Sequence, residues 1–500
     1  MTLLTSLARV IAARAGYAEP TKTRRHIHLS SRPLVLIPLQ LAGEACAPLA
    51  VMVGAERDKP LQLTVYEPRD RARRFEFAAD LAETVLAYID GYASTEPDDG
   101  QSYEDAPQLL VPNMGGVAFA RLFGRSTRFR QAVGEYAVPA GVPLLGRWLS
   151  YYAERTEATG SALLVPLTTA LADHWATGQS AMEDANLAAL LSWIDPQDGM
   201  TGHEAARLAE DPVRCPPAGP ATDPTFDNEV LDHLVKDVGD AAAAGHGGAL
   251  ARAQAAMDAA LSSQLEPTWE LMWRSVDLLR ALPAAASVQE RWKSDRWSFT
   301  GQVGWLRDGG APQPRRDGAV AAARRLARLE REQQRLAVQR AYDDPLVMAE
   351  YRLTGEAFAG LVTAADPARL DTQGKRARLR PRITVLTTDE VMIEPGTVLR
   401  SPDRPGQEAT VITVAHPDGA SPDGEHPTPV ILELKGGMGQ AKVAPPGTMP
   451  EVGDEVTYTT LRDEFQRAPE FPALENTPWT HGGPPAEYVP TDDDAQEGWS

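Results

Sequence analysis

The side chains best suited to chemistry lie in a run of cations and tryptophans that begins at residue 291. Its core consists of Arg291, Trp292, Lys293, Arg296 and Trp297. Indole faces stack on nucleobases, and arginine or lysine neutralises phosphates, so this mixture indicates a nucleic-acid-binding surface. Because tryptophan is highly buried on average, the same pattern is also typical of a core or a domain seam whose cations face solvent.

A second basic run closes the same region of the chain. It consists of Lys375, Arg376, Arg378, Arg380 and Arg382. We expect a linker between the last helix and the first strand of a β-rich region, where these charges would follow a phosphate backbone or an acidic partner. A hinge that pairs with the protein's own acidic surface, including the aspartates at 492–494, fits the pattern equally.

Both runs belong to a basic island in an acidic protein. Residues 291–382 contain 19 Lys and Arg against 11 Asp and Glu, whereas the 500-residue chain has a formal net charge of −20. This balance disfavours non-specific binding of polyanions over the whole surface, but exposed charges are screened beyond about 10 Å, so a local site is allowed. The predicted partner is DNA or RNA, or an acidic protein.

Two further groups of arginines have the same potential. The first recurs every three or four residues: Arg324, Arg328, Arg331 and Arg335. These residues share one face of a predicted helix, which is either a binding face or an ordinary solvated one. The second interleaves four arginines with phenylalanines at 121–130, where a turn at 124–127 is either an anion-binding nest or an ordinary helix–loop junction.

The signals for catalysis are weaker. The densest acidic group contains Asp223, Asp227, Glu229, Asp232 and His233. Its carboxylates have the chemistry to hold a divalent cation for phosphodiester hydrolysis, but helix capping explains the same residues.

No glycine-rich phosphate loop, H-E-x-x-H pair or G-x-S-x-G turn accompanies this acidic group. We therefore predict a non-catalytic accessory protein without a metal or cofactor. The alternative is a metal-dependent hydrolase or nuclease built around Asp227.

The remaining composition bears on location. Cys46 and Cys215 are far apart and lack metal-ligand spacing, which suits a reducing cytoplasm. No run reaches the ~18 apolar residues of a membrane span, so no membrane partner is expected. The N-terminal segment 1–16 has the pattern of a transit peptide or of a short amphipathic helix on the first domain. The sequence does not indicate an oligomeric state.

The elements that must position these residues predict a multidomain α+β chain with a predominantly helical middle. We expect a small α+β domain at 1–93, a helical domain at 107–211, a second helical domain carrying the basic helix at 225–365, a β-barrel-like domain at 383–462 and a disordered acidic tail at 463–500. The turns at 394–397 and 452–456 resemble those that lead into strands of SH3-like and OB-like small barrels.

Hydrophobic periodicity gives the individual elements. In the N-terminal domain we predict an antiparallel meander of strands at 34–39, 48–53 and 61–66. Helices are predicted at 75–89, 144–152, 162–175, 182–193, 228–238, 249–265, 267–282, 319–342 and 346–362, with a capping box at Ser180 and Glu183. Barrel strands are predicted at 383–386, 397–399, 409–414, 430–434 and 455–458.

Overall fold

The computed structural model describes residues 3–44, 47–197, 199–216, 219–314, 317–372, 377–415, 427–439, 442–462, 470, 472, 473 and 476. Two compact units are present. The large unit comprises Thr5–Gln333 with Ala468–Ser500, and the barrel unit comprises Gln334–Arg467 with Met1–Leu4. Each contains helices and strands, so the chain is multidomain α+β. Helix α12 (Ala319–Asp343) crosses the division, and its residues 319–333 belong to the large unit.

The large unit is built around a five-stranded sheet with the order β4-β3-β2-β5-β6. Its strands are β2 (Leu34–Gln40), β3 (Pro48–Gly54), β4 (Leu61–Thr64), β5 (Leu109–Val111) and β6 (Leu164–Pro166). β2, β3 and β4 pair in antiparallel register, so the predicted meander is confirmed. β5 and β6 then extend the sheet in parallel with β2.

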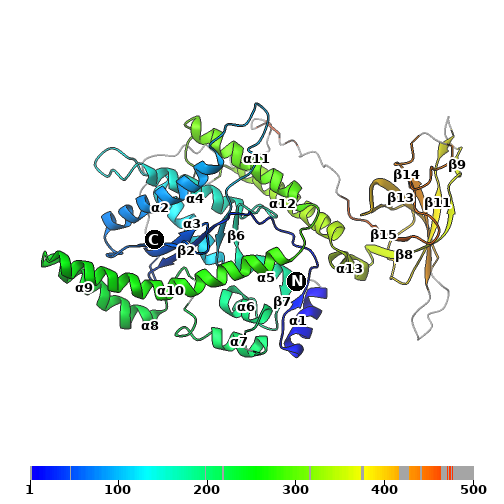
Figure 1. Cartoon of the computed structure of the whole chain (residues 1–500). Coiled ribbons are helices and arrows are strands. Elements are labelled where there is room, and N and C mark those ends of the chain that lie inside the picture. Colours follow the sequence, from blue (N-terminus) through cyan, green and yellow to red (C-terminus); the bar gives the residue numbers. More distant parts are fainter. Residues whose placement is uncertain are drawn as a thin grey trace. The chain divides into compact units, whose positions relative to one another are not determined.

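Two layers of helices cover this sheet because its central strands are apolar on both faces. Six of the seven residues in both β2 and β3 are buried, without the alternation of a half-exposed strand. Figure 1 shows helices on both sides of the sheet, with α10 opposite the other three. These helices are α2 (Arg71–Tyr92), α3 (Met114–Thr127), α4 (Gly141–Arg155) and α10 (Gly247–Ala281).

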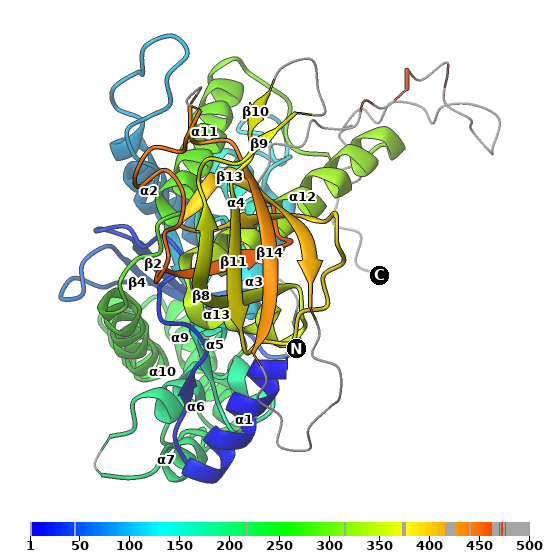
Figure 2. The same ribbon diagram turned by 90° about the vertical axis from the view of Figure 1, so that its right-hand side faces the viewer.

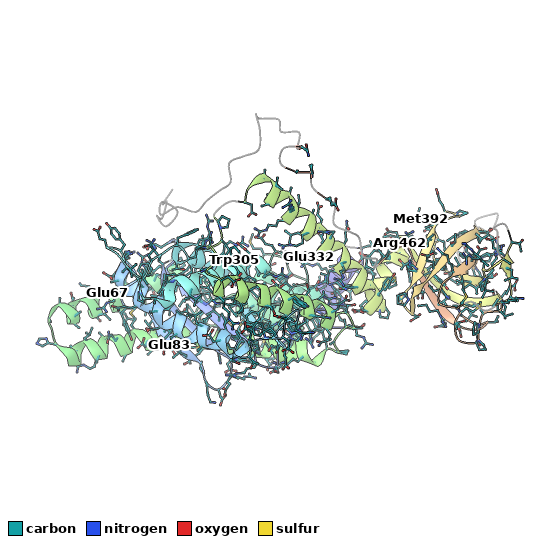
Figure 3. The ribbon with its side chains drawn as sticks, turned by 90° about the horizontal axis from the view of Figure 1, so that it is seen from above. Glu67, Glu83, Trp305, Glu332, Met392 and Arg462 are labelled. Atoms are coloured by element: carbon teal, nitrogen blue, oxygen red, sulfur yellow. The ribbon has the colours of Figure 1, made fainter. Side chains whose placement is uncertain are left out.

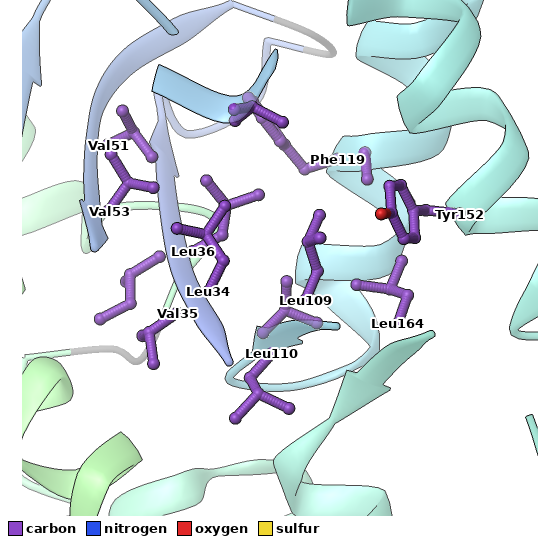
Figure 4. Close-up of a cluster of buried hydrophobic side chains, with 14 of the residues drawn as sticks. Leu34, Val35, Leu36, Val51, Val53, Leu109, Leu110, Phe119, Tyr152 and Leu164 are labelled. Atoms are coloured by element: carbon purple, nitrogen blue, oxygen red, sulfur yellow. The ribbon is translucent and has the colours of Figure 1, made fainter. Parts of the chain in front are cut away.

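The core lies between the sheet and these helices (Figure 4). Leu36 of β2 and Leu109 of β5 are at most 1% exposed, as is Tyr152 of α4. The hydroxyl group of Tyr152 donates a hydrogen bond to the carbonyl of Pro107, 3.2 Å away, which satisfies its polar atom inside the core.

Smaller elements complete the large unit. Its other helices are α1 (Leu3–Ala15), α5 (Leu167–His174), α6 (Leu187–Ile194), α7 (Gly202–Ala209), α8 (Pro224–Phe226), α9 (Asp232–Ala243) and α11 (Val288–Arg307). A 3₁₀ turn spans Glu183–Ala185, a π-helical turn spans Asp227–Leu231, and β1 (Glu19–Pro20) pairs with β7 (Trp175–Ala176).

The helices predicted in the large unit need correction at three places. The helix predicted at 162–175 is wrong at its start, where residues 164–166 pair with β5 as β6. Ser180 and Glu183 do exchange the hydrogen bonds of a capping box, but they cap the 3₁₀ turn, and Asn186 caps α6. The helices predicted on either side of Pro267 form one helix, α10. Apolar residues are buried on both sides of the proline, and their packing outweighs its cost of about 3 kcal/mol.

The barrel unit contains a closed antiparallel barrel of six strands in the order β11-β14-β13-β12-β15-β8. Figure 2 shows β8, β11, β14 and β13 side by side. The strands are β8 (Ala357–Asp366), β11 (Arg382–Thr387), β12 (Val398–Ser401), β13 (Arg404–Val414), β14 (Thr428–Lys435) and β15 (Glu455–Thr459). A hairpin of β9 (Leu370–Asp371) and β10 (Arg378–Leu379) lies between β8 and β11 in the chain.

The five barrel strands predicted from residue 383 onward are confirmed, but the helix predicted at 346–362 is too long. Helix α13 (Pro345–Leu353) ends before Gly355, which has a φ of 73°, and β8 begins at Ala357. β8 then pairs with β11 and with β15, so it closes the barrel.

The structure bears differently on the predicted acidic tail, the predicted domain boundaries and the expected lack of a membrane span. The acidic tail predicted at 463–500 lies outside the described residues, apart from 470, 472, 473 and 476. The five domain boundaries stay predictions. Among the described residues, none of the helices is both long and apolar enough to cross a membrane.

Candidate functional site

The cavity that best fits the predicted chemistry lies in the large unit, beside α4, α11 and α12, and has a volume of about 910 Å³. It is lined by Tyr151, Glu154, Arg155, Ser298, Asp317, Ala321, Arg324, Arg325, Arg328, Arg331 and Glu470. Five cationic side chains therefore face three anionic ones, which leaves a net charge of +2. We call this cavity the arginine cleft.

Helix α12 supplies four of the five arginines. Its sequence is rich in alanine, leucine, arginine and glutamate, all strong helix formers. The three- and four-residue spacing places Arg324, Arg328 and Arg331 on one face. At a rise of 1.5 Å per residue, this row is about 10 Å long. Arg335, the fourth predicted member, is not among the residues that line the cleft.

Arg325 holds the start of α12 against the end of α4. Its guanidinium group donates to Glu157, 2.6 Å away, and to Asp317, 3.2 Å away. Burial lowers the pKa of Arg325, but the charges of Glu157 and Glu154 outweigh it, so the pKa is raised. Arg325 is therefore a positioning residue that stays charged.

The wall opposite α12 is fixed by a buried ion pair. Arg155 donates to Asp295, with 3.1 Å between the nitrogen and oxygen atoms, and the Asp295 side chain is 1% exposed. The carboxylate of Asp295 also accepts hydrogen bonds from Ser161 and from the backbone N–H of Ala162, both at 2.7 Å. Burial raises the pKa of Asp295, whereas Arg155 and these hydrogen bonds act in the opposite direction. The network holds Arg155 at the cleft.

Two other groups complete this wall. The Tyr151 hydroxyl group donates to the Ser298 hydroxyl oxygen, 2.9 Å away, and so ties α4 to α11. Burial raises the pKa of Glu154, against the opposing charges of Arg325 and Arg128. A raised pKa means that Glu154 is neutralised more readily as the pH falls, which makes the cleft more positive.

The arrangement of guanidinium groups suits the binding of anions. Each arginine presents a planar set of donors that matches phosphate or carboxylate oxygens. In the described part of the chain, no group of three or more His, Cys, Asp or Glu side chains is placed to hold a metal ion. The five arginines equip the cleft to bind an anion through charge and hydrogen bonds.

The opening run, predicted to bind a partner, lies on α11, and none of its five predicted residues lines the cleft. Trp292 is 4% exposed, and its indole stacks on His28 with 3.9 Å between ring centroids. The Trp292 Nε1–H donates to Asp105, 2.8 Å away. Trp292 is therefore a packing residue, as the core alternative requires.

The cations of the opening run differ in their contacts. Arg291 donates to the backbone carbonyl of His26 at 2.8 Å, and Arg296 donates to that of Glu104 at 2.6 Å. Lys293 and Trp297 are exposed. Arg291 and Arg296 thus join α11 to other segments of the large unit.

The closing run lies in the barrel unit, and Lys375 and Arg376 are outside the described residues. Its other residues do not form the predicted linker. Arg378 is exposed in β10, the backbone N–H of Arg380 donates to the carbonyl of Arg369, and Arg382 begins β11. The Arg382 guanidinium group pairs with Glu433, a neighbour across the ladder, at 3.1 Å. The basic island is thus divided between the two units.

The other candidates have structural contacts. In the 121–130 segment, Arg128 is 5% exposed and donates to Ser150, 3.1 Å away. In the acidic segment, Asp223 caps α8 through the backbone N–H of Thr225, and Asp227 accepts from the backbone N–H of Ala42 at 3.3 Å.

The other three members of the acidic segment are exposed; they are Glu229, Asp232 and His233. Asp223 therefore has the helix-capping role that was the alternative to metal binding.

The sequence indicated the α12 face but not the opposite wall of the cleft. Tyr151, Glu154 and Arg155 lie on an amphipathic helix about 170 residues earlier in the chain. No local signal separates them from ordinary surface or core positions. The contact of Arg325 with Glu157, which follows α4, brings them to the α12 arginines.

Comparisons with known proteins add no relationship. No protein-family description, curated protein or solved structure matches this chain.

Proposed function

We propose that this protein is a non-catalytic accessory protein whose large unit binds the phosphate backbone of a nucleic acid in the arginine cleft. One observation carries the proposal: five arginines from two helices line a single cavity of about 910 Å³. The row on α12 is long enough to contact successive phosphates, and phosphate contacts of this kind position a nucleic acid without reading its sequence.

The charge balance supports a local, salt-sensitive site. The chain carries a net charge of −20, so general attraction to a polyanion is weak. Within the cleft, Glu154, Asp317 and Glu470 offset three of the five arginines. We expect measurable binding at low ionic strength and steep weakening as salt increases.

The test compares two triple variants of the full chain. Arg324→Ala, Arg328→Ala and Arg331→Ala together remove the α12 row, and at about 50 mM salt we expect binding of a labelled oligonucleotide to weaken at least tenfold. The matched control removes three exposed arginines of the large unit elsewhere: Arg207, Arg214 and Arg252. Equal weakening by both variants means that the cleft is not the binding site.

An acidic protein partner is the competing outcome. Carboxylates also accept hydrogen bonds from arginine, so poly-glutamate is the appropriate probe. If poly-glutamate binds more tightly than an oligonucleotide of equal charge, the partner of the cleft is an acidic protein and not a nucleic acid. A third variant, Arg378→Ala with Arg380→Ala, tests whether the closing run contributes. We propose that its contribution is smaller, because the guanidinium group of Arg380 donates to the carbonyl of Leu379, and that of the neighbouring Arg382 pairs with Glu433, both in the barrel unit.

For the barrel unit, we propose the SH3-like or OB-like architecture that its turns resemble. Two features support this proposal: the closed six-stranded barrel, and Gly396 and Gly453 at φ values of 90° and 99° in the two turns. Such φ values favour glycine. A cytoplasmic location stays a prediction.

A further inference from the structure

Trp305 on α11 is an exposed indole held in one orientation. Its side chain is 53% exposed, although tryptophan is usually buried. The indole Nε1–H donates to the carbonyl of Ala311, 2.9 Å away. The backbone of Gly310 packs against the ring so closely that a Cβ atom there would overlap Cε2. Gly310 therefore lets the chain support the indole while leaving more than half of it open. Figure 3 marks this residue.

The position of Trp305 relates it to the arginine cleft. Ser298, the α11 residue that lines the cleft, precedes Trp305 by seven residues. Seven residues make nearly two turns, so both side chains lie on the same helix face, about 10 Å apart along the axis. The Arg147 guanidinium group of α4 donates to the carbonyl of Gly310, and the same helix supplies Tyr151 and Arg155 to the cleft. The indole thus continues the wall that α4 and α11 form.

Two glycines of α11, Gly301 and Gly304, lie close to Trp305 in the sequence. A Cβ atom at Gly301 or Gly304 would meet no atom within 4 Å, so packing does not require glycine at either position. Glycine inside a helix is one of the least favourable residues, and alanine would be the ordinary choice. Gly301 precedes Trp305 by four residues, so it lies about one turn away on the same helix face, and without a side chain it leaves that part of the face open to a ligand.

We propose that Trp305 stacks on a nucleobase of a single-stranded nucleic acid whose phosphates are bound in the arginine cleft. This inference rests on the proposed function and adds that the ligand is single-stranded. Every base has a face that an indole can cover, so the contact is independent of sequence. A paired base in a duplex does not offer that face.

The test measures binding of the full chain to four probes: a fluorescein-labelled oligo(dT), a labelled oligo(rU), a labelled duplex and inorganic polyphosphate. We expect Trp305→Ala to weaken oligo(dT) binding about tenfold, within the range of one lost base–indole stack. Binding of polyphosphate and of the duplex should be unchanged, and Trp305→Phe should restore most of the affinity. Oligo(rU) should lose as much as oligo(dT), because stacking does not involve the sugar. A loss confined to one of them would overturn base stacking.

Trp297 provides a matched control, because it is also exposed on α11 but lies about a quarter turn from the face of Ser298. Trp297→Ala should bind oligo(dT) like the wild type. Gly310→Ala should displace the indole and weaken oligo(dT) binding, with no additional loss when it is combined with Trp305→Ala.

The two proposals fail in different ways. If the wild type binds neither polyphosphate nor oligo(dT) at low salt, the cleft function is wrong and the stacking inference with it. If the wild type binds both and Trp305→Ala changes neither, or weakens both equally, only the stacking inference is overturned.

Discussion

Acidification should destabilise the large unit through a buried histidine, His174. His174 is 1% exposed. The ring Nε2 accepts the backbone N–H of His26 at 3.1 Å, and Nδ1 lies 2.7 Å from the carbonyl of Ala170. A neutral ring with its proton on Nδ1 satisfies both contacts. A second proton on Nε2 would face the N–H of His26, so the structure favours the neutral form.

The size of the effect follows from the pKa. Burial lowers the pKa of His174 from 6.5 to about 4, against the opposing charge of Asp173. As the pH falls below 6.5, the unfolded chain takes up a proton that the folded chain does not, so the free energy of unfolding decreases. The loss from His174 is about 2 kcal/mol at pH 5 and about 3 kcal/mol at pH 4. Above about pH 7.5 this residue has almost no effect. Burial also lowers the pKa of His28 to about 4, so its contribution has the same sign.

The assay is urea unfolding followed by tryptophan fluorescence. Gln334–Arg467 contains no tryptophan, so the signal reports on the large unit. We compare wild type, His174→Gln and the exposed control His246→Gln at about pH 7.5 and about pH 5. His174→Gln should lose about 2 kcal/mol less than the wild type between the two pH values, even if it is less stable at both. His246→Gln should follow the wild type. Parallel pH profiles for wild type and His174→Gln would refute the reasoning.

Two further predictions concern packing and charge. Gly146→Ala should destabilise the large unit by about 1–3 kcal/mol, because its Cβ atom would lie 2.5 Å from the backbone nitrogen of Arg128 where α4 crosses α3. Gly239→Ala, on the open side of α9, should instead stabilise it by up to about 1 kcal/mol, and urea unfolding measures both. A chain ending at residue 462 should bind inorganic polyphosphate severalfold more tightly, because it lacks a segment with nine acids and one base whose Glu470 lines the cleft. Unchanged affinity on truncation would show that the acidic segment does not compete for the cleft.

Local chemistry explains which elements were predictable from the sequence. The helix predicted at 319–342 is α12, because strong helix formers and arginine spacing agree there. The barrel strands after residue 383 were also recognisable, since β-branched runs alternate with glycine and proline turns. Each of these signals comes from residues that are close together in the chain.

The errors arose where tertiary contacts override local preference. Four of the ten residues that form β8 are alanine, which is depleted in strands, so the local strand signal is weak, yet pairing with β11 and β15 makes the segment a strand. In the candidate site, the α12 arginines were identified because they share a helix face. Arg155 could not be found in this way, because its role depends on Asp295, 140 residues later in the chain.

The central claim, that α12 arginines in the cleft bind phosphates, is tested most directly by the salt dependence of oligonucleotide binding. The logarithm of the association constant is measured against the logarithm of the KCl concentration for the wild type and for the Arg324, Arg328 and Arg331 triple alanine variant. Each phosphate contact with a single strand contributes about 0.7 to the slope, so the loss of three contacts should make the slope about 2 shallower. Parallel lines for the two proteins would contradict the claim.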